Sequence, residues 1–272
     1  MPMDSPSGIS LILRILIPCF YGITAIGYII HFIKSSKKLQ GWVKSAFLVG
    51  IGLHLLLFLL LFYQRGTLPL STVFEGLFFC SLILSALYLL TEYILKETCY
   101  GAFLWPLNLI ISILATANLY TGTPLPAAMN SVYFIFHASF LLTAYACFFL
   151  SFIIALMYLL QYNEIKKRHL GHLFKRLPAL ESMDISVARL DALGLALLFL
   201  GIIVGFLWLD LVPGSVYRMQ VKIGFSVLAG VVYLFEHLMR VTKGWKGQRA
   251  NLVSISGFIF ILITLFIGRH GY

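Results

Sequence analysis

The sequence predicts an all-α protein, a polytopic transmembrane bundle of about eight helices with both termini on the outer side of the membrane. Hydrophobic residues make up 60% of its 272 residues and charged residues only 11%, so lipid must surround most of the chain. The hydrophobic residues form eight runs, each near the roughly 20-residue length that crosses a bilayer. The basic residues gather on alternate loops, which sets the orientation.

The eight runs follow one another with short connections. They lie near residues 11–33, 45–63, 70–91, 100–119, 132–160, 190–211, 219–240 and 252–268. The first run is longer than the apolar part of a signal peptide and lacks a small-residue cleavage motif after it, so we expect a retained helix. Because little chain remains between the runs, we expect residues 1–272 to form a single integral membrane domain.

The connections carry local signals. Pro69 suits a helix start, and Ser71 or Thr72 can cap that helix. The uncharged segment 120–131 contains two prolines and is expected to cover the bundle mouth. The longest polar stretch, residues 161–189, repeats apolar residues at helical spacing among basic ones, which is typical of a helix lying in the membrane interface.

The net charge of +10 arises from the loops. With the N-terminus outside, 15 of the 20 Lys and Arg residues fall on inner loops, which the positive-inside rule explains without any nucleic-acid partner. The five on the outer side are Arg14, Arg65, Arg218, Lys222 and Arg269. The predicted location is therefore the cell (cytoplasmic) membrane, with multiple passes.

Polar residues inside lipid are costly and are candidates for function. Glu75, expected six residues into the third helix, either links helices as a neutral, hydrogen-bonded acid or faces a polar cavity at the outer mouth. His54 either bonds a neighbouring helix or serves as a ligand. The four cysteines are scattered and contain no CxxC pair, so we expect them to pack rather than react.

The inner side offers two further histidine candidates. Glu236 and Arg240 are spaced for an ion pair along one helix, and His237 between them either ligates a haem at the inner face or is an ordinary interfacial histidine. His169 and His172, three residues apart, either share a metal ion or lie on a solvated face.

On the outer side, polar and aromatic candidates converge. They are His137, Trp208, Tyr217, Arg218, Lys222 and His270. Two imidazoles can take both axial positions of a haem iron, a tryptophan supplies a flat apolar wall, and Arg or Lys pairs with propionates. The alternative is an aromatic belt with ordinary interfacial charges.

Several segments resemble the cytochrome c assembly protein family, which includes CcsA-like and HemX-like proteins. They are GTLPLSTVFEGLFF at 66–79, the helix FHASFLLTAYACFFLSFIIALMYLLQ at 136–161, LPALESMD at 177–184, GWKGQRA at 244–250 and the closing IGRHGY at 267–272. The similarity covers roughly residues 45–272. It implies that His137 and His270 are the family's two external histidines, that the cofactor is haem b, and that the protein is not an enzyme.

The resemblance also implies partners. In a CcsA-like protein these are haem, a CcsB or ResB-type membrane protein and apocytochrome c. The family's tryptophan-rich WxWDPKE core is replaced here, where Met219, Gln220 and Val221 precede the matching Lys222. The alternative is therefore a HemX-type regulator of haem biosynthesis, which acts through cytoplasmic loops on a soluble haem-synthesis enzyme.

Overall fold

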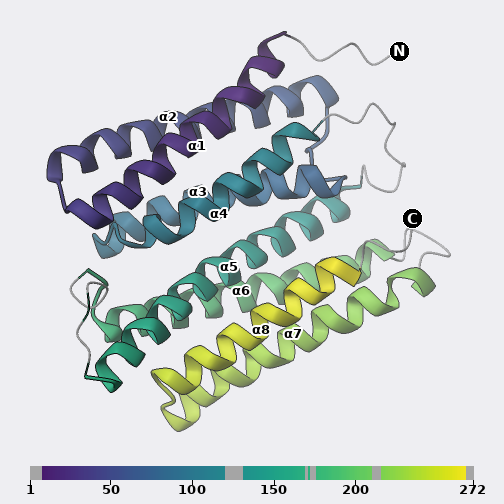
Figure 1. The fold of residues 1–272 in the computed structure, drawn as a ribbon. Coiled ribbons are helices and arrows are strands. Elements are labelled where there is room, and N and C mark those ends of the chain that lie inside the picture. The colour runs from purple at the N-terminus through teal and green to yellow at the C-terminus, as the bar shows by residue number, and fades with distance from the viewer. Residues whose placement is uncertain (1–7, 120–130, 169–170, 172–175, 210–215, 268–272) are drawn as a thin grey trace. The chain divides into compact units, whose positions relative to one another are not determined.

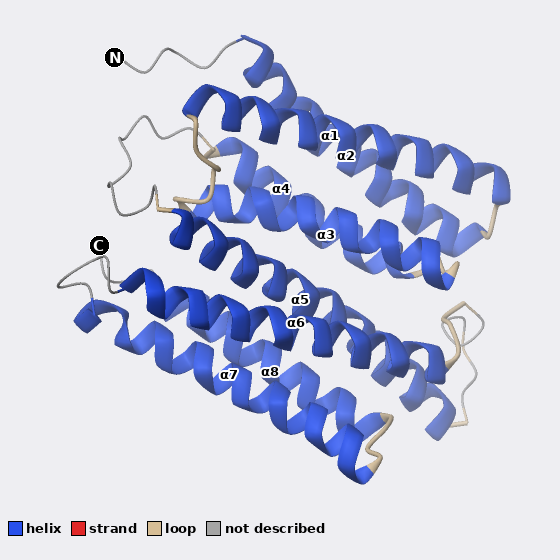
Figure 2. Cartoon of the chain, turned by 180° about the vertical axis from the view of Figure 1, so that it is seen from behind, coloured by secondary structure: helices blue, strands red, loops and turns tan. Residues whose placement is uncertain are grey.

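The computed structural model is helical, with short connections between the helices (Figure 1). It describes residues 8–119, 131–168, 171, 176–209 and 216–267. The side chains of residues 37, 216–223 and 264–267 are not described. Helices and short loops are the elements of these parts, and no strand occurs among them (Figure 2). The helices are α1 Gly8–Lys34, α2 Lys37–Arg65, α3 Val73–Leu95, α4 Tyr100–Ala117, α5 Val132–Lys166, α6 Leu180–Leu209, α7 Val216–Lys243 and α8 Gln248–Ile267. The prediction of eight helices is confirmed.

The helices have the length and surface of membrane spans. Seven of them, α1 to α7, are long and apolar enough to cross a bilayer, and α8 is apolar along its described side chains. Large aliphatic side chains point outward, such as Ile15 at 66% and Ile26 at 61% exposure. Since water would not tolerate such a surface, the chain is a multi-pass membrane protein. Which end of each helix faces outward stays a prediction.

The chain forms two compact units, residues 1–130 and 131–272. In the first unit, α1 packs most extensively on α2 and α4. Its core is an aromatic cluster around the fully buried Trp105. Rings of Tyr21, Phe47 and Tyr88 meet the indole edge-on, with the Phe47 centroid at 4.8 Å, and Tyr28 stacks parallel to it. Whether the full chain behaves as one domain stays a prediction.

A buried polar network joins the four helices of this unit. The His54 ring on α2 accepts from the Tyr21 hydroxyl at Nδ1 (2.9 Å) and donates from Nε2 to the Phe78 carbonyl (3.1 Å). Ser85 on α3 lies 2.9 Å from the Tyr21 hydroxyl and accepts from Asn108 on α4. Both ring nitrogens of His54 are therefore engaged, which confirms the helix-linking alternative over a ligand role.

The start of α3 is fixed by a capping box. The Thr72 hydroxyl accepts from the Glu75 amide, and the Glu75 carboxylate accepts from the Thr72 amide. Glu75 also pairs with Arg65, the last residue of α2. The expectation that Glu75 lies deep in its helix was wrong, because the helix begins at Val73 and not at Pro69. Glu75 links α2 and α3, as one of the two alternatives proposed. It does so as an acid paired with Arg65 and not as a neutral, hydrogen-bonded acid.

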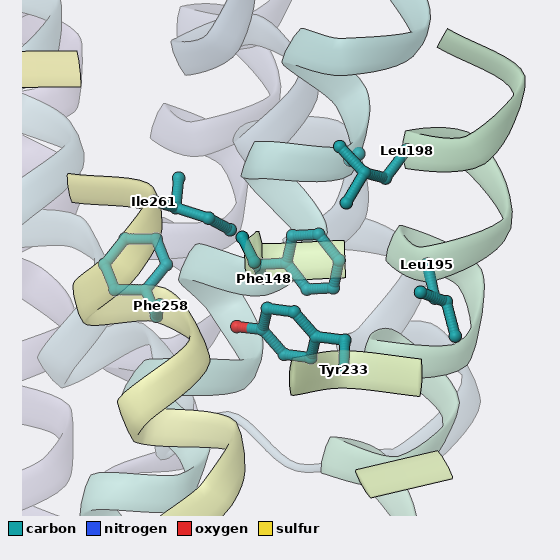
Figure 3. Close-up of a cluster of buried hydrophobic side chains, with 8 residues drawn as sticks. Phe148, Leu195, Leu198, Tyr233, Phe258 and Ile261 are labelled. Atoms are coloured by element: carbon teal, nitrogen blue, oxygen red, sulfur yellow. The ribbon is translucent and has the colours of Figure 1, made fainter. Parts of the chain in front are cut away.

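In the second unit, α5 packs most extensively on α6, while α7 packs on α8 and α6, and α8 on α5. The core between these helices is apolar and aromatic (Figure 3). The Phe148 and Tyr233 rings stack 3.8 Å apart near the centre, with Leu198 and Phe258 beside them.

The predicted interfacial helix over 161–189 is wrong as a single element. Residues 161–166 complete α5 and residues 180–189 open α6. The apolar residues that suggested the interfacial helix are Leu170, Leu173, Phe174 and Leu177; the first three lie outside the described residues, and Leu177 lies in the connection before α6. His169 and His172 lie outside the described residues, as does most of the 120–131 segment.

Candidate functional site

His137 lies in the second turn of α5, near the end where the helix is capped by Ser131. Its half-buried ring has Nδ1 2.7 Å from the Gly201 carbonyl of α6. A carbonyl oxygen only accepts, so Nδ1 carries the proton and Nε2 keeps its lone pair. Histidines that bind metals are commonly held in this way, with one ring nitrogen donating to a carbonyl and the other left to bind.

Two glycines of α6 make room for this contact. A Cβ at Gly205 would lie 2.5 Å from His137 Nδ1, and a Cβ at Gly201 would lie 2.7 Å from Leu141 of α5. Any larger residue there would push α5 and α6 apart or displace the imidazole. The sequence analysis missed these residues, although their spacing of four is the small-xxx-small pattern of close helix contacts in membranes.

Trp208 lies beside His137, one turn beyond Gly205. The two rings are stacked, with centroids 6.0 Å apart and planes inclined by 22°. Phe134, one turn before His137 on α5, also packs against the indole, with ring centroids 5.1 Å apart. The tryptophan is buried. Two helix segments from distant parts of the sequence therefore place an imidazole and an indole side by side.

The other four candidates can be placed only in part. Tyr217, Arg218 and Lys222 belong to the first two turns of α7, and their side chains lie outside the described residues. His270 also lies outside them, three residues after the end of α8 at Ile267. Because neighbouring helices in this unit run antiparallel, the start of α7 and the end of α8 lie at the same end as His137 and Trp208 (Figure 1).

The opposite end of the unit holds the predicted ion pair. Arg240 donates from Nε to Glu236, which confirms that pair, and from Nη1 to Asp184 of α6 at 3.0 Å. Asp184 also accepts from the Asn251 side chain of α8 at 2.8 Å. His237 lies close enough to Glu236 to interact with its charge. The spacing along α7 predicted the Glu236–Arg240 pair. It did not predict that Arg240 also bonds Asp184 of α6, which in turn bonds Asn251 of α8.

Comparison with known proteins places the chain among membrane proteins of one kind. The family model described as "Cytochrome C assembly protein" matches residues 70–271. The protein HemX of Brevibacillus brevis is 26% identical over 252 residues, covering 91% of each chain. The cytochrome c biogenesis protein CcsA of Trieres chinensis is 26% identical over 296 residues, covering 93% of this chain and 94% of its own.

Proposed function

Since the chain belongs to the cytochrome c assembly protein family, we propose that it is a non-enzymatic membrane protein that binds haem for cytochrome c maturation, in the manner of CcsA. The observation that carries the proposal is the His137 ring, whose Nδ1 is held by the Gly201 carbonyl while Trp208 lies along its face. The protein belongs in the cytoplasmic membrane, with this end of the second unit on the outer side.

The residues fit a haem better than a bare metal ion. No group of three or more His, Cys, Asp or Glu residues in the described parts of the chain is arranged to hold a metal. A porphyrin brings four nitrogen ligands of its own and asks the protein only for axial ligands and apolar walls. His137 Nε2 is a suitable axial donor, and the indole of Trp208 is a suitable wall.

The remaining roles are proposed from topology and family resemblance. His270 would be the second residue to bind the haem iron, because α8 ends at the same end of the unit as His137. Tyr217 would extend the aromatic wall, and Arg218 or Lys222 would pair with a propionate. Haem b is the form that the family resemblance implies. A CcsB or ResB-type protein and apocytochrome c would be the partners.

An absorption spectrum of the purified protein tests the proposal. We expect a Soret band that weakens or shifts in His137→Ala and in His270→Ala, with partial recovery on adding imidazole. His237→Ala, at the opposite end of the unit, is the matched control and should leave the band unchanged. A protein without a Soret band, or one whose band is the same in both variants, would contradict the proposed site.

A HemX-type role is the second candidate, favoured by the match to HemX across 91% of both chains and by the absence of the tryptophan-rich core. In that role the chain would regulate haem biosynthesis by binding a soluble haem-synthesis enzyme through its basic loops. It predicts that the loop between α5 and α6 is essential and that His137 and His270 are dispensable. Co-purification of such an enzyme, lost when that loop is replaced, would support this role.

A further inference from the structure

The second unit buries more negative than positive charge at the end opposite His137. Three acids lie there, Asp184, Asp191 and Glu236, at 8%, 1% and 1% exposure. Arg240 is the cation that contacts two of them, Asp184 and Glu236. One guanidinium cannot neutralise three carboxylates, and His237 acts on Glu236, so among the described side chains no cation is in contact with Asp191.

Asp191 is the acid that Arg240 does not reach. Both of its carboxyl oxygens are buried, and among the described residues no cation or backbone amide bonds them; the groups near enough to interact with them are the hydroxyls of Ser151 and Ser254. Asp184, by contrast, is bonded by Arg240 and by Asn251. An ionised carboxylate left without a cation partner inside a membrane bundle is strongly disfavoured, and a proton is the simplest means of removing its charge.

The groups around Asp191 suit a proton and not a second charge. From α5 and α8 come the hydroxyls of Ser151 and Ser254, which are fully buried and 3.4 Å apart. From α7 comes the Tyr233 hydroxyl, which donates to the Ser254 carbonyl, and Glu236, which adds further negative charge. Hydroxyl oxygens can accept a bond from a protonated carboxyl.

We propose that Asp191 is a proton-binding site, in which a neutral carboxylic acid points its O–H toward Ser151 or Ser254. When the site releases its proton, the O–H bond breaks, the electron pair stays on the carboxylate and water takes up the proton. Asp191 lies 11 residues, about 16 Å, from the start of α6. Asp184 is two turns nearer that polar end on the same face of the helix.

The proposal does not depend on haem binding, and it separates two aspartates on one helix. In Asp191→Asn the amide replaces a group that is already neutral, so the melting temperature should stay the same or rise. In Asp184→Asn the change removes a charge that Arg240 needs, so the melting temperature should fall. Wild-type protein should become less stable as pH rises, since unfolding releases the Asp191 proton to water, and Asp191→Asn should lose this part of the pH dependence.

Infrared spectroscopy supplies the direct reading. The protein in nanodiscs should show the C=O stretch of a protonated carboxyl that is absent in Asp191→Asn and present in Asp184→Asn and His137→Ala. If Asp191→Asn does not accumulate, the Ser151→Ala/Ser254→Ala double variant retains the acid and should shift that band. A spectrum in which Asp191→Asn keeps the band, or a wild-type protein stabilised by Na⁺ through Asp191, would overturn the proposal.

Discussion

Gly205 shows how one missing side chain can set the position of a candidate ligand. A Cβ there would come within 2.5 Å of His137 Nδ1, so Gly205→Ala must rotate the imidazole or separate α5 from α6. We expect the variant to fold but to show a weaker Soret band than the wild type. Gly52→Ala, where an added Cβ meets nothing within 4 Å, is the control and should be silent. Identical spectra for Gly205→Ala and wild type would contradict this role.

Cys99 tests whether the cysteines only pack. It lies between α3 and α4, and burial raises the pKa of its thiol to about 12, with the nearby charge of Glu97 acting in the same direction. Because the thiolate is the reactive form, Cys99 should resist alkylation from neutral pH up to about pH 10 in the folded protein and react after denaturation. Mass spectrometry of single-cysteine protein would check this, and rapid labelling of the native form would refute it.

The site residues that could be predicted from the sequence are those whose side chains have a distinctive chemistry. His137 and Trp208 were identified as candidates because an imidazole or an indole at a helix end is unusual, and the structure brings the two together. Gly201 and Gly205 were missed because their role depends on the side chains of α5 that pack against them, and the sequence does not show which side chains those are. Asp191 was missed because it lies at the start of an apolar run. Sequence spacing does not show that Arg240 contacts Asp184 and Glu236 but not Asp191.

At the scale of elements, the α2–α3 connection depends on Glu75. Its carboxylate caps α3 and pairs with Arg65 at the end of α2. Glu75→Ala removes both contacts and should lower the free energy of unfolding by about 2 kcal/mol. Glu75→Gln keeps a capping side chain and should lose about half as much. Denaturation in detergent measures both, and equal effects of the two variants would show that the cap contributes nothing.

Helix positions were predictable because lipid demands long apolar runs, but helix ends were less so. The α3 cap at Thr72 was anticipated as one of two options, since hydroxyl residues commonly start helices. The 161–189 stretch was misread because α5 extends to Lys166 and α6 starts at Leu180, beyond their most apolar parts. The predicted span therefore included the polar last turn of α5 and the polar first turns of α6, which composition alone does not assign to the long helices.

At the scale of the whole molecule, the two units share an order of packing and differ in their buried polar groups. In each, the first helix packs on the second and the fourth. The first unit satisfies both nitrogens of its buried histidine, His54. In the second, the buried Asp191 lies near the Ser151 and Ser254 hydroxyls with no cation in contact among the described side chains, and His137 donates from Nδ1 to the Gly201 carbonyl. The proposed ligand residues therefore all belong to the second unit, whereas the buried histidine of the first unit links its helices.

The orientation of the whole chain is the prediction on which the outer position of His137 rests. Within each unit, most basic residues gather at one end of the antiparallel helices, and these ends should face the cytoplasm. In a cysteine-free background, an impermeant maleimide applied to intact cells should label Gln64→Cys and Val132→Cys. It should label Ser35→Cys and Lys246→Cys only after the membrane is permeabilised. All four positions are exposed, so failure to label reflects sidedness and not burial. The reverse pattern would place His137 on the cytoplasmic side and would remove the topological basis for its external role.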